Sequence, residues 1–280
     1  MTKDTSNQYV TVYKCETWEE FIQEVRKIIG RPLGRRYYRG QQDTTWPLSS
    51  IFERWLLRRR GANHTRHLSE MFAPGELDKS RNSYVDRFKE LARGLPGLPN
   101  VMSSDDWWIL GRHHGLVTPL LDWSESPYVA SFFAFIGNME EQNPDFRMVN
   151  FARTGVIRWG TGVIAIWCLT DAEGLQLKDE FEIIRPETEF AVHSQRIRAQ
   201  KSIFTRLTHD TNTDIESYVK SRGIPGALER FEIPGSQAAK ALRDLELMNI
   251  SFSDLFPDLG GAATHANLGS MISLIGGLDD

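Results

Sequence analysis

The chain has 280 residues, of which 40% are hydrophobic and 25% are charged, and its formal net charge is −4. This composition suits a globular protein with a substantial core, and the negative charge excludes a global attraction to nucleic acid or to an anionic membrane. Two cysteines, Cys15 and Cys168, are too few for a disulfide framework or a cysteine-based metal site.

In the N-terminal half, the spacing of apolar residues predicts mainly helices. The first covers Trp18–Ile29, with Thr17 as its cap, and a short strand follows around Tyr37. Further helices are expected over residues 51–60 and 69–92 and from Ser104 onward, and a Gly- and Pro-rich loop is expected over residues 93–103.

The C-terminal half is richer in predicted strands. Residues 162–169 form a continuous β-rich apolar run, which is typical of a central strand. Further strands are expected over 181–184, 197–200, 204–207 and 228–233, followed by a helix over 237–248. Repeated glycines predict an irregular tail over 260–280. The expected fold class is α+β, with a mixed, mostly antiparallel sheet core, helices supplied largely by the N-terminal half, and one compact unit over 1–259.

The first nine residues are polar, and no apolar run approaches the roughly 18 residues that a membrane span needs. We therefore expect no membrane association and a cytoplasmic location. A P-loop, a Gly-x-Gly-x-x-Gly after a strand and a Gly-x-Ser-x-Gly turn are absent from the sequence. Because His113 and His114 are adjacent, they do not form paired zinc ligands, and we expect no metal site.

One segment reads as a strand, a turn and a helix. An apolar run ends in Asp122-Trp123-Ser124, and Pro127, a preferred first residue of a helix, opens an apolar amphipathic stretch. A carboxylate and a hydroxyl at a strand end beside a helix N-terminus are well placed to contact an anionic ligand. The alternative is that Asp122 and Ser124 only cap the helix.

A second segment lies about eighty residues upstream. Tyr37 and Tyr38 favour a short strand, and Arg39-Gly40 at its end places a planar cation beside a residue that lets a ligand approach the backbone. The alternative is that Arg39 forms an ordinary surface ion pair.

Together the two segments resemble the FRG domain family. That family is named for a Phe/Tyr-Arg-Gly element, here Tyr38-Arg39-Gly40, and its other hallmark is here the run from His113 through Trp123. Segments at 18–22, 196–200, 204–205, 233–234 and 255–259 also resemble family signatures, so the resemblance covers most of the chain. Arg112 stands where a Gln is common.

A remoter resemblance is to the ADP-ribosyltransferase superfamily. It is carried by the order of Arg39, Asp122-Trp123-Ser124 and the helix sequence from Pro127 to Ala134. The resemblance implies an ADP-ribosyltransferase-like sheet and NAD as the substrate. It implies NAD binding by Arg39, Gly40, Gln41, Thr118, Trp123 and Ser124, and catalytic roles for Asp122, Gln200 and His113.

The implied reaction breaks the nicotinamide–ribose bond, which develops positive charge on the ribose. Gln200 stands near the position where that superfamily has a Glu, and a carboxamide supplies no negative charge. Asp122, or else Glu187 or Glu189, is therefore the candidate for stabilising that charge. The alternative is a buried Arg39–Asp122 ion pair that joins two strands, with Gln200 satisfying backbone groups.

The leading expectation is an NAD-dependent ADP-ribosyltransferase or NAD glycohydrolase, acting as a bacterial intracellular effector. A role in a toxin or anti-phage defence system is implied by the family resemblance alone. The alternatives are a non-catalytic nucleotide- or nucleic-acid-binding module of the same fold, and a hydrolase acting on NAD or nucleic acid. The expected partners are NAD and a protein or nucleic-acid acceptor.

A dense basic cluster is formed by Arg54, Arg58, Arg59 and Arg60. Such a cluster is usually a solvated helix face, and the alternative is contact with nucleic-acid phosphates. The aromatic residues near the turn are interpreted as core and cleft wall, and Trp123 and Phe132 are expected to be buried. Finally, one cleft is expected to be lined by Arg39, His113, Asp122, Ser124 and Gln200.

Overall fold

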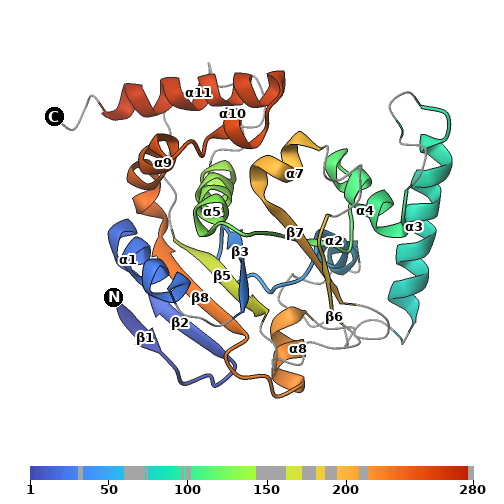
Figure 1. Cartoon of the computed structure of the whole chain (residues 1–280), viewed down its shortest axis with the longest axis horizontal. Helices are drawn as coiled ribbons and strands as arrows, with labels where there is room; N and C mark the ends of the chain where they lie inside the picture. Colours follow the sequence, from blue (N-terminus) through green and yellow to red (C-terminus); the bar gives the residue numbers. More distant parts are fainter. Residues whose placement is uncertain are drawn as a thin grey trace.

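The computed structural model describes residues 1–30, 34–59, 73, 75–95, 98, 102–142, 162–171, 181–186, 194–207 and 214–276. Within these residues, eight strands form one open sheet in the order β1-β2-β8-β5-β3-β4-β7-β6. Strands β2 and β8 pair in parallel, and every other neighbouring pair is antiparallel. The expected α+β class with a mixed, mostly antiparallel sheet is confirmed (Figure 1).

The strands are β1 (Thr2–Asp4), β2 (Val10–Lys14), β3 (Arg35–Gln41), β4 (Leu121–Ser124), β5 (Val163–Asp171), β6 (Phe181–Ile184), β7 (Ser202–Leu207) and β8 (Leu228–Pro234). The helices are α1 (Trp18–Ile29), α2 (Ile51–Arg59), α3 (Glu76–Ala92), α4 (Ser104–His113), α5 (Pro127–Gln142), α7 (Gln195–Gln200), α8 (Ile215–Ser221), α9 (Ala238–Leu247), α10 (Phe252–Leu255) and α11 (Leu259–Gly276), with a short 3₁₀ turn, η4 (Gly235–Gln237).

Strand β5 lies in the middle of the sheet, and its side chains alternate between two hydrophobic cores. Ile164 and Ile166 join a core that also contains buried residues of α1, α5 and α9, whereas Ala165 and Trp167 join a core that contains residues of α8. The continuous apolar run of β5 follows from burial on both faces of the sheet. Figure 1 shows α1, α5 and α9 grouped on one side of the molecule and α8 apart from them.

The pairing of β3 brings the two sequence motifs together. Strand β3 pairs with β5 along its whole length, and on its other side it pairs with β4, where Tyr38 lies opposite Ser124. Helix α5 packs directly on β3 at Gly40. The contact is so close that a Cβ atom added at Gly40 would lie 2.0 Å from the backbone oxygen of Ala130. Arg39 and Asp122 therefore lie on adjacent strands beside α5.

The structure corrects two predicted elements. Residues 197–200 belong to helix α7 and not to a strand, because Ile197 packs into a small core with residues of α3 and α4. The expected irregular tail over 260–280 is wrong for residues 260–276, which belong to helix α11. A Cβ atom added at Gly261 would lie 1.9 Å from the backbone oxygen of Phe256, so this glycine permits a close approach inside the C-terminal region.

Trp123 and Phe132 are buried, as predicted, and Cys15 and Cys168 are buried free thiols. In the part of the chain that the structure describes, no helix is long and apolar enough to cross a membrane, and no cluster of metal-ligating side chains is found.

Candidate functional site

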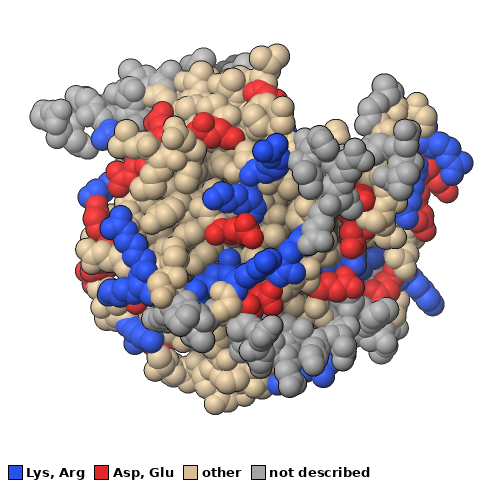
Figure 2. Space-filling model, viewed as in Figure 1, with Lys and Arg blue, Asp and Glu red and all other residues tan. Residues whose placement is uncertain are grey.

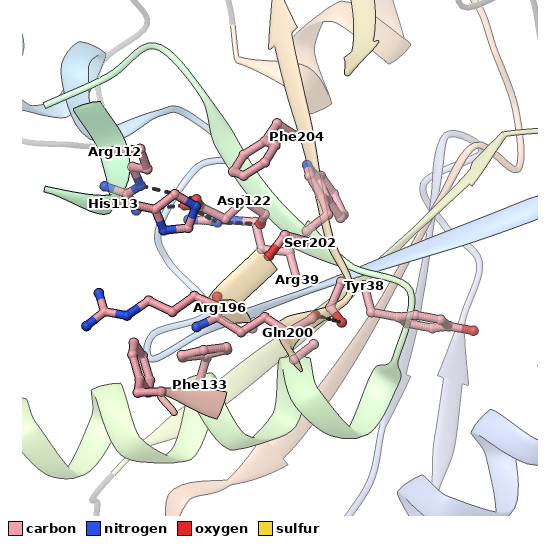
Figure 3. A pocket seen from close by; sticks show the side chains of 15 residues that line it. Tyr38, Arg39, Arg112, His113, Asp122, Phe133, Arg196, Gln200, Ser202 and Phe204 are labelled. Carbon is pink, nitrogen blue, oxygen red and sulfur yellow. Dashed lines mark hydrogen bonds and ion pairs between the residues drawn. The ribbon is translucent and has the colours of Figure 1, made fainter. Parts of the chain in front are cut away.

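A cavity of about 340 Å³ opens where β3, β4 and β7 meet α4, α5, α7 and α10 (Figure 3). We call it the cleft. Its lining combines cations, one carboxylate and aromatic rings: Tyr38, Arg39, Gly40, Arg112, His113, Asp122, Trp123, Ser124, Ala130, Phe133, Arg196, Gln200, Ser202, Phe204 and Phe256.

Asp122 of β4 is held by two arginines. Its Oδ1 accepts a hydrogen bond from Nε of Arg112 at 3.1 Å, and its Oδ2 accepts one from the terminal NH2 nitrogen of Arg112 at 2.7 Å. Arg39 of β3 donates to the backbone oxygen of Asp122 at 2.7 Å, and its NH1 nitrogen lies 3.8 Å from Oδ2. Arg112, which was not predicted as a site residue, is thus the main partner of the carboxylate.

Among the residues that the structure describes, two guanidinium groups face one carboxylate, so this part of the cleft floor carries surplus positive charge. Burial lowers the pKa of Arg39 to about 9, and the charge of Asp122 offsets this effect only in part. Arg39 therefore remains charged at neutral pH. Burial alone would raise the pKa of Asp122, but the charge and hydrogen bonds of Arg112, together with Arg39, lower it. The Arg39 side chain is 13% exposed, and its Nε has no hydrogen-bond partner within the described structure.

His113 ends α4 beside Arg112. Its Nε2 is buried and has no hydrogen-bond partner among the residues that are described. Burial lowers the pKa of His113, the nearby Arg196, His114 and Arg112 lower it further, and Asp122 opposes them. The ring is therefore neutral at neutral pH.

Ser124 and Gln200 connect β4 to the far wall of the cleft. The Ser124 hydroxyl donates to the backbone oxygen of Gln200 at 2.7 Å, and Nε2 of Gln200 donates to the backbone oxygen of Leu255 at 3.0 Å. The helix cap at this turn is Ser126, whose Oγ accepts from the Val129 amide, and not Asp122 or Ser124. Gln200 thus satisfies a backbone group, as the structural alternative expected.

The mouth of the cleft has an aromatic and charged edge. The rings of Phe133 and Phe256 meet edge to face with their centroids 6.0 Å apart. The Arg196 guanidinium lies over the Phe256 ring, 5.3 Å from its centroid, and pairs with Asp258 at 2.5 Å. Arg196 therefore adds a third cation to the lining, although Asp258 already offsets its charge.

The predicted site residues divide into those inside and those outside the cleft. The expectation of one shared cleft is confirmed for Arg39, His113, Asp122, Ser124 and Gln200, and Gly40 and Trp123 line it too. Their chemical roles stay predictions. The close approach that Gly40 permits in the structure is that of helix α5. Trp123 is buried and donates from its indole nitrogen to the hydroxyl of Thr205 at 2.8 Å.

Gln41 and Thr118 are not among the residues that line the cleft, and their expected part in ligand binding stays a prediction. Gln41 is buried, accepts from the Trp167 indole at 2.8 Å and donates to the backbone oxygen of Pro47. Thr118 is fully buried. Glu187 and Glu189 lie outside the described residues.

Sequence reasoning did not predict the cations Arg112 and Arg196 or the ring of Phe256 as part of the cleft, whereas Phe133 lines it as expected of an aromatic residue near the turn. The signal for Arg112 was its place directly before His113, at the end of the helical stretch whose apolar part begins at Trp107. Nothing in the sequence indicated that Phe256 would contact Phe133, which lies more than a hundred residues upstream. The aromatic wall depends on the packing of α10 against α7.

The basic cluster on α2 is described only in part. Arg54 donates to the backbone oxygen of Ser49 at 2.5 Å, and its guanidinium lies over the Trp46 ring. The side chains of Arg58 and Arg59, and all of Arg60, lie outside the described residues. Figure 2 shows Lys and Arg side chains gathered across the middle of the face in view, with acidic side chains between them.

The model of the FRG domain family matches residues 34–143. That stretch contains Arg39, Arg112, His113, Asp122 and Ser124, whereas the wall formed by α7, β7 and α10 lies outside it. No curated protein and no solved structure matches the chain. The comparisons therefore support an FRG domain over this stretch and give no support to the resemblance to ADP-ribosyltransferases.

Proposed function

We propose that the cleft binds a phosphate-bearing nucleotide and that its ligand is NAD. The observation that carries the proposal is the surplus of guanidinium groups on the cleft floor, where Arg39 and Arg112 share the carboxylate of Asp122, the one carboxylate in the described lining. Arginine is suited to phosphate because its planar fork donates two parallel hydrogen bonds to oxygen atoms. A phosphate on this floor would balance the charge that Asp122 leaves uncompensated.

The size and walls of the cleft support a nucleotide. A volume of about 340 Å³ lies within the range of roughly 300–1,000 Å³ that is usual for small-molecule sites. Phe133, Phe204 and Phe256 offer apolar surface to a planar ring. Because the volume is at the lower end of this range, we expect one part of a dinucleotide to be enclosed and the rest to extend from the mouth.

The proposed chemistry is cleavage of the bond between nicotinamide and ribose. The carbon–nitrogen bond breaks, its electron pair leaves with nicotinamide, and an acceptor nucleophile attacks the ribose carbon. The acceptor is water in an NAD glycohydrolase and a protein or nucleic-acid group in a transferase. The Asp122 carboxylate would stabilise the positive charge on the ribose. Its charge is offset by Arg112 in the free protein, so a ligand phosphate must draw Arg112 toward itself before Asp122 can act.

Binding and nicotinamide release test this proposal together. We expect calorimetry to show saturable NAD binding and chromatography to show released nicotinamide. Arg39→Gln should weaken binding at least tenfold, because a hydrogen bond to a charged group contributes about 1.5–3 kcal/mol. The matched control is Arg87→Gln, which removes the same charge from a side chain that is 69% exposed and lies outside the cleft. Absence of NAD binding, or equal binding by both variants, would overturn the proposal.

A second candidate is a nucleotide-binding module that performs no reaction. It is favoured by the pairing of Asp122 with Arg112 and by the use of the Gln200 amide in a backbone hydrogen bond. This candidate predicts that NAD and ADP-ribose bind the cleft and that NAD is recovered intact. A role as a toxin or defence effector, and contact with nucleic acid through Arg54 and its neighbours, stay predictions from the sequence.

A further inference from the structure

His113 holds a buried ring nitrogen, Nε2, that forms no hydrogen bond with any other residue that the structure describes. Its ring lies between the side chains of Arg112 and Arg196, close to Asp122, as Figure 3 shows. Its Nε2 is buried without a hydrogen-bond partner in the described structure. Buried polar atoms in native proteins nearly always have a partner, so an orphan atom on a residue that lines a cavity is a candidate for a hydrogen bond with a ligand.

The charges around this ring keep it neutral in the free protein. Asp122 faces it from β4 and Arg196 from α7, and Arg112 and His114 precede and follow it in the chain. Burial, Arg196, His114 and Arg112 lower the pKa of His113, and among these groups Asp122 alone raises it. An anion placed in the cleft would reverse this balance, because it would offset Arg112 and Arg196 and attract a proton to the ring.

We propose that His113 takes up a proton from solvent when a phosphate-bearing ligand enters the cleft, and then donates from Nε2 to a phosphate oxygen. The inference depends on one part of the proposed function, namely that the ligand carries a phosphate. In this protonation step the Nε2 lone pair of His113 accepts the proton, and no other bond changes. The neutral ring becomes a cationic donor at the point where the anion is bound, so phosphate esters are selected over neutral nucleosides.

The chain supplies a matched control beside the tested residue. His114 is exposed, is not part of the cleft lining, and differs from His113 by one position. His114→Gln therefore removes an imidazole from the same helix end without removing the buried ring nitrogen. Any effect that depends on proton uptake inside the cleft should appear in His113→Gln and be absent from His114→Gln.

Calorimetry measures the proton directly. ADP-ribose, which has no nicotinamide bond to break, is titrated into the protein near pH 7.5 in two buffers with different ionisation enthalpies. We expect net proton uptake approaching one per ligand for the unmodified protein and for His114→Gln, and none for His113→Gln. The affinity should fall as pH rises from 6 to 8, by at most about tenfold per pH unit, because the proton is bound with the ligand.

Nuclear magnetic resonance makes the test independent of whether His113→Gln folds. The ring signals of His113 and His114 are followed against pH in the unmodified protein, without and with ADP-ribose. We expect only His113 to titrate at higher pH when ligand is present. Binding without proton uptake and without this shift would overturn the inference and leave the proposed nucleotide site intact. Failure of NAD, ADP-ribose and inorganic pyrophosphate to bind would overturn both.

Discussion

Two clusters of arginine and carboxylate side chains in this protein balance their charge in opposite ways. Arg81 of α3 is 7% exposed and pairs with two carboxylates, Glu53 at 2.7 Å and Asp78 at 3.0 Å. In the cleft the ratio is inverted, because Arg39 and Arg112 share Asp122. The first cluster has more negative than positive charge, and the second has the reverse.

The two ratios have different consequences. Burial alone would lower the pKa of Arg81, but Glu53 and Asp78 outweigh it and raise that pKa, whereas burial lowers the pKa of Arg39. The cavity beside Arg81 has a volume of about 10 Å³, against about 340 Å³ for the cleft. Full compensation without space is typical of a structural ion pair, and surplus charge beside open space is typical of a ligand site.

The comparison predicts the largest loss of stability at the compensated cluster. Glu53→Gln keeps the shape of a side chain that is 7% exposed but removes the main counter-charge of Arg81. Breaking such a buried pair should lower the free energy of unfolding by about 3–5 kcal/mol, measured by urea denaturation. Ligand affinity of the folded protein should be unchanged, since Glu53 does not line the cleft.

The control for Glu53→Gln is Glu90→Gln. Glu90 pairs with Arg87 at 3.2 Å on the surface, where it is 63% exposed, and the loss there should stay below about 1 kcal/mol. Equal losses in the two variants would contradict a structural role for the Arg81 cluster and would remove the contrast with the cleft.

Asp122→Asn tests the other side of the comparison. Removing this carboxylate should lower nicotinamide release by a factor of about 100 or more, the scale for loss of one preorganised electrostatic group. ADP-ribose affinity should be unchanged or tighter, because the variant leaves more positive charge on the cleft floor. Parallel binding and turnover assays separate the two effects. A much earlier thermal transition, with turnover per folded molecule unchanged, would identify Asp122 as a structural anchor for Arg112.

The position of the cleft was predictable because its first half is encoded by short local patterns. Arg39 and Asp122 lie within the short strands β3 and β4, and the pairing of these two strands brings the two side chains together. The sequence could not show that Arg112 would donate hydrogen bonds to both carboxylate oxygens of Asp122, because that pairing depends on how α4 packs beside β4.

The second half of the cleft was harder to predict for a physical reason. Arg196-Ile197-Arg198-Ala199 alternates polar and apolar residues as a strand does, yet it folds as α7 because a single apolar residue, Ile197, is enough to attach so short a helix to the core. In the C-terminal tail, glycine frequency favoured irregular structure. Tertiary packing overrides it in α11, where Leu268 is buried in the main core.

Arg112→Gln should turn the cleft floor into a compensated cluster. Arg39 alone would then face Asp122, so the surplus charge that favours a phosphate would disappear. We expect ADP-ribose affinity to fall roughly tenfold, which corresponds to about 1.4 kcal/mol. Calorimetry on Arg112→Gln and on the surface control Arg87→Gln makes the comparison. Unchanged ADP-ribose affinity in Arg112→Gln would show that Arg39 alone suffices for binding. The ratio of arginines to carboxylates on the cleft floor would then not identify the ligand site.

The smallest expected effect is a shift in the titration of Asp122. Burial tends to raise the pKa of this carboxyl, and Arg112 is the main group that lowers it. Because the folded-state pKa is depressed, the stabilisation is present above the unfolded value of about 3.9 and is lost as pH falls through the folded value. In Arg112→Gln the carboxyl should protonate at higher pH, so the loss should begin earlier on acidification. The side chain is 36% exposed, so solvent screens the effect, and carboxyl ¹³C chemical shifts report it better than denaturation. An unchanged titration in Arg112→Gln would show that Arg39, and not Arg112, governs the charge of Asp122.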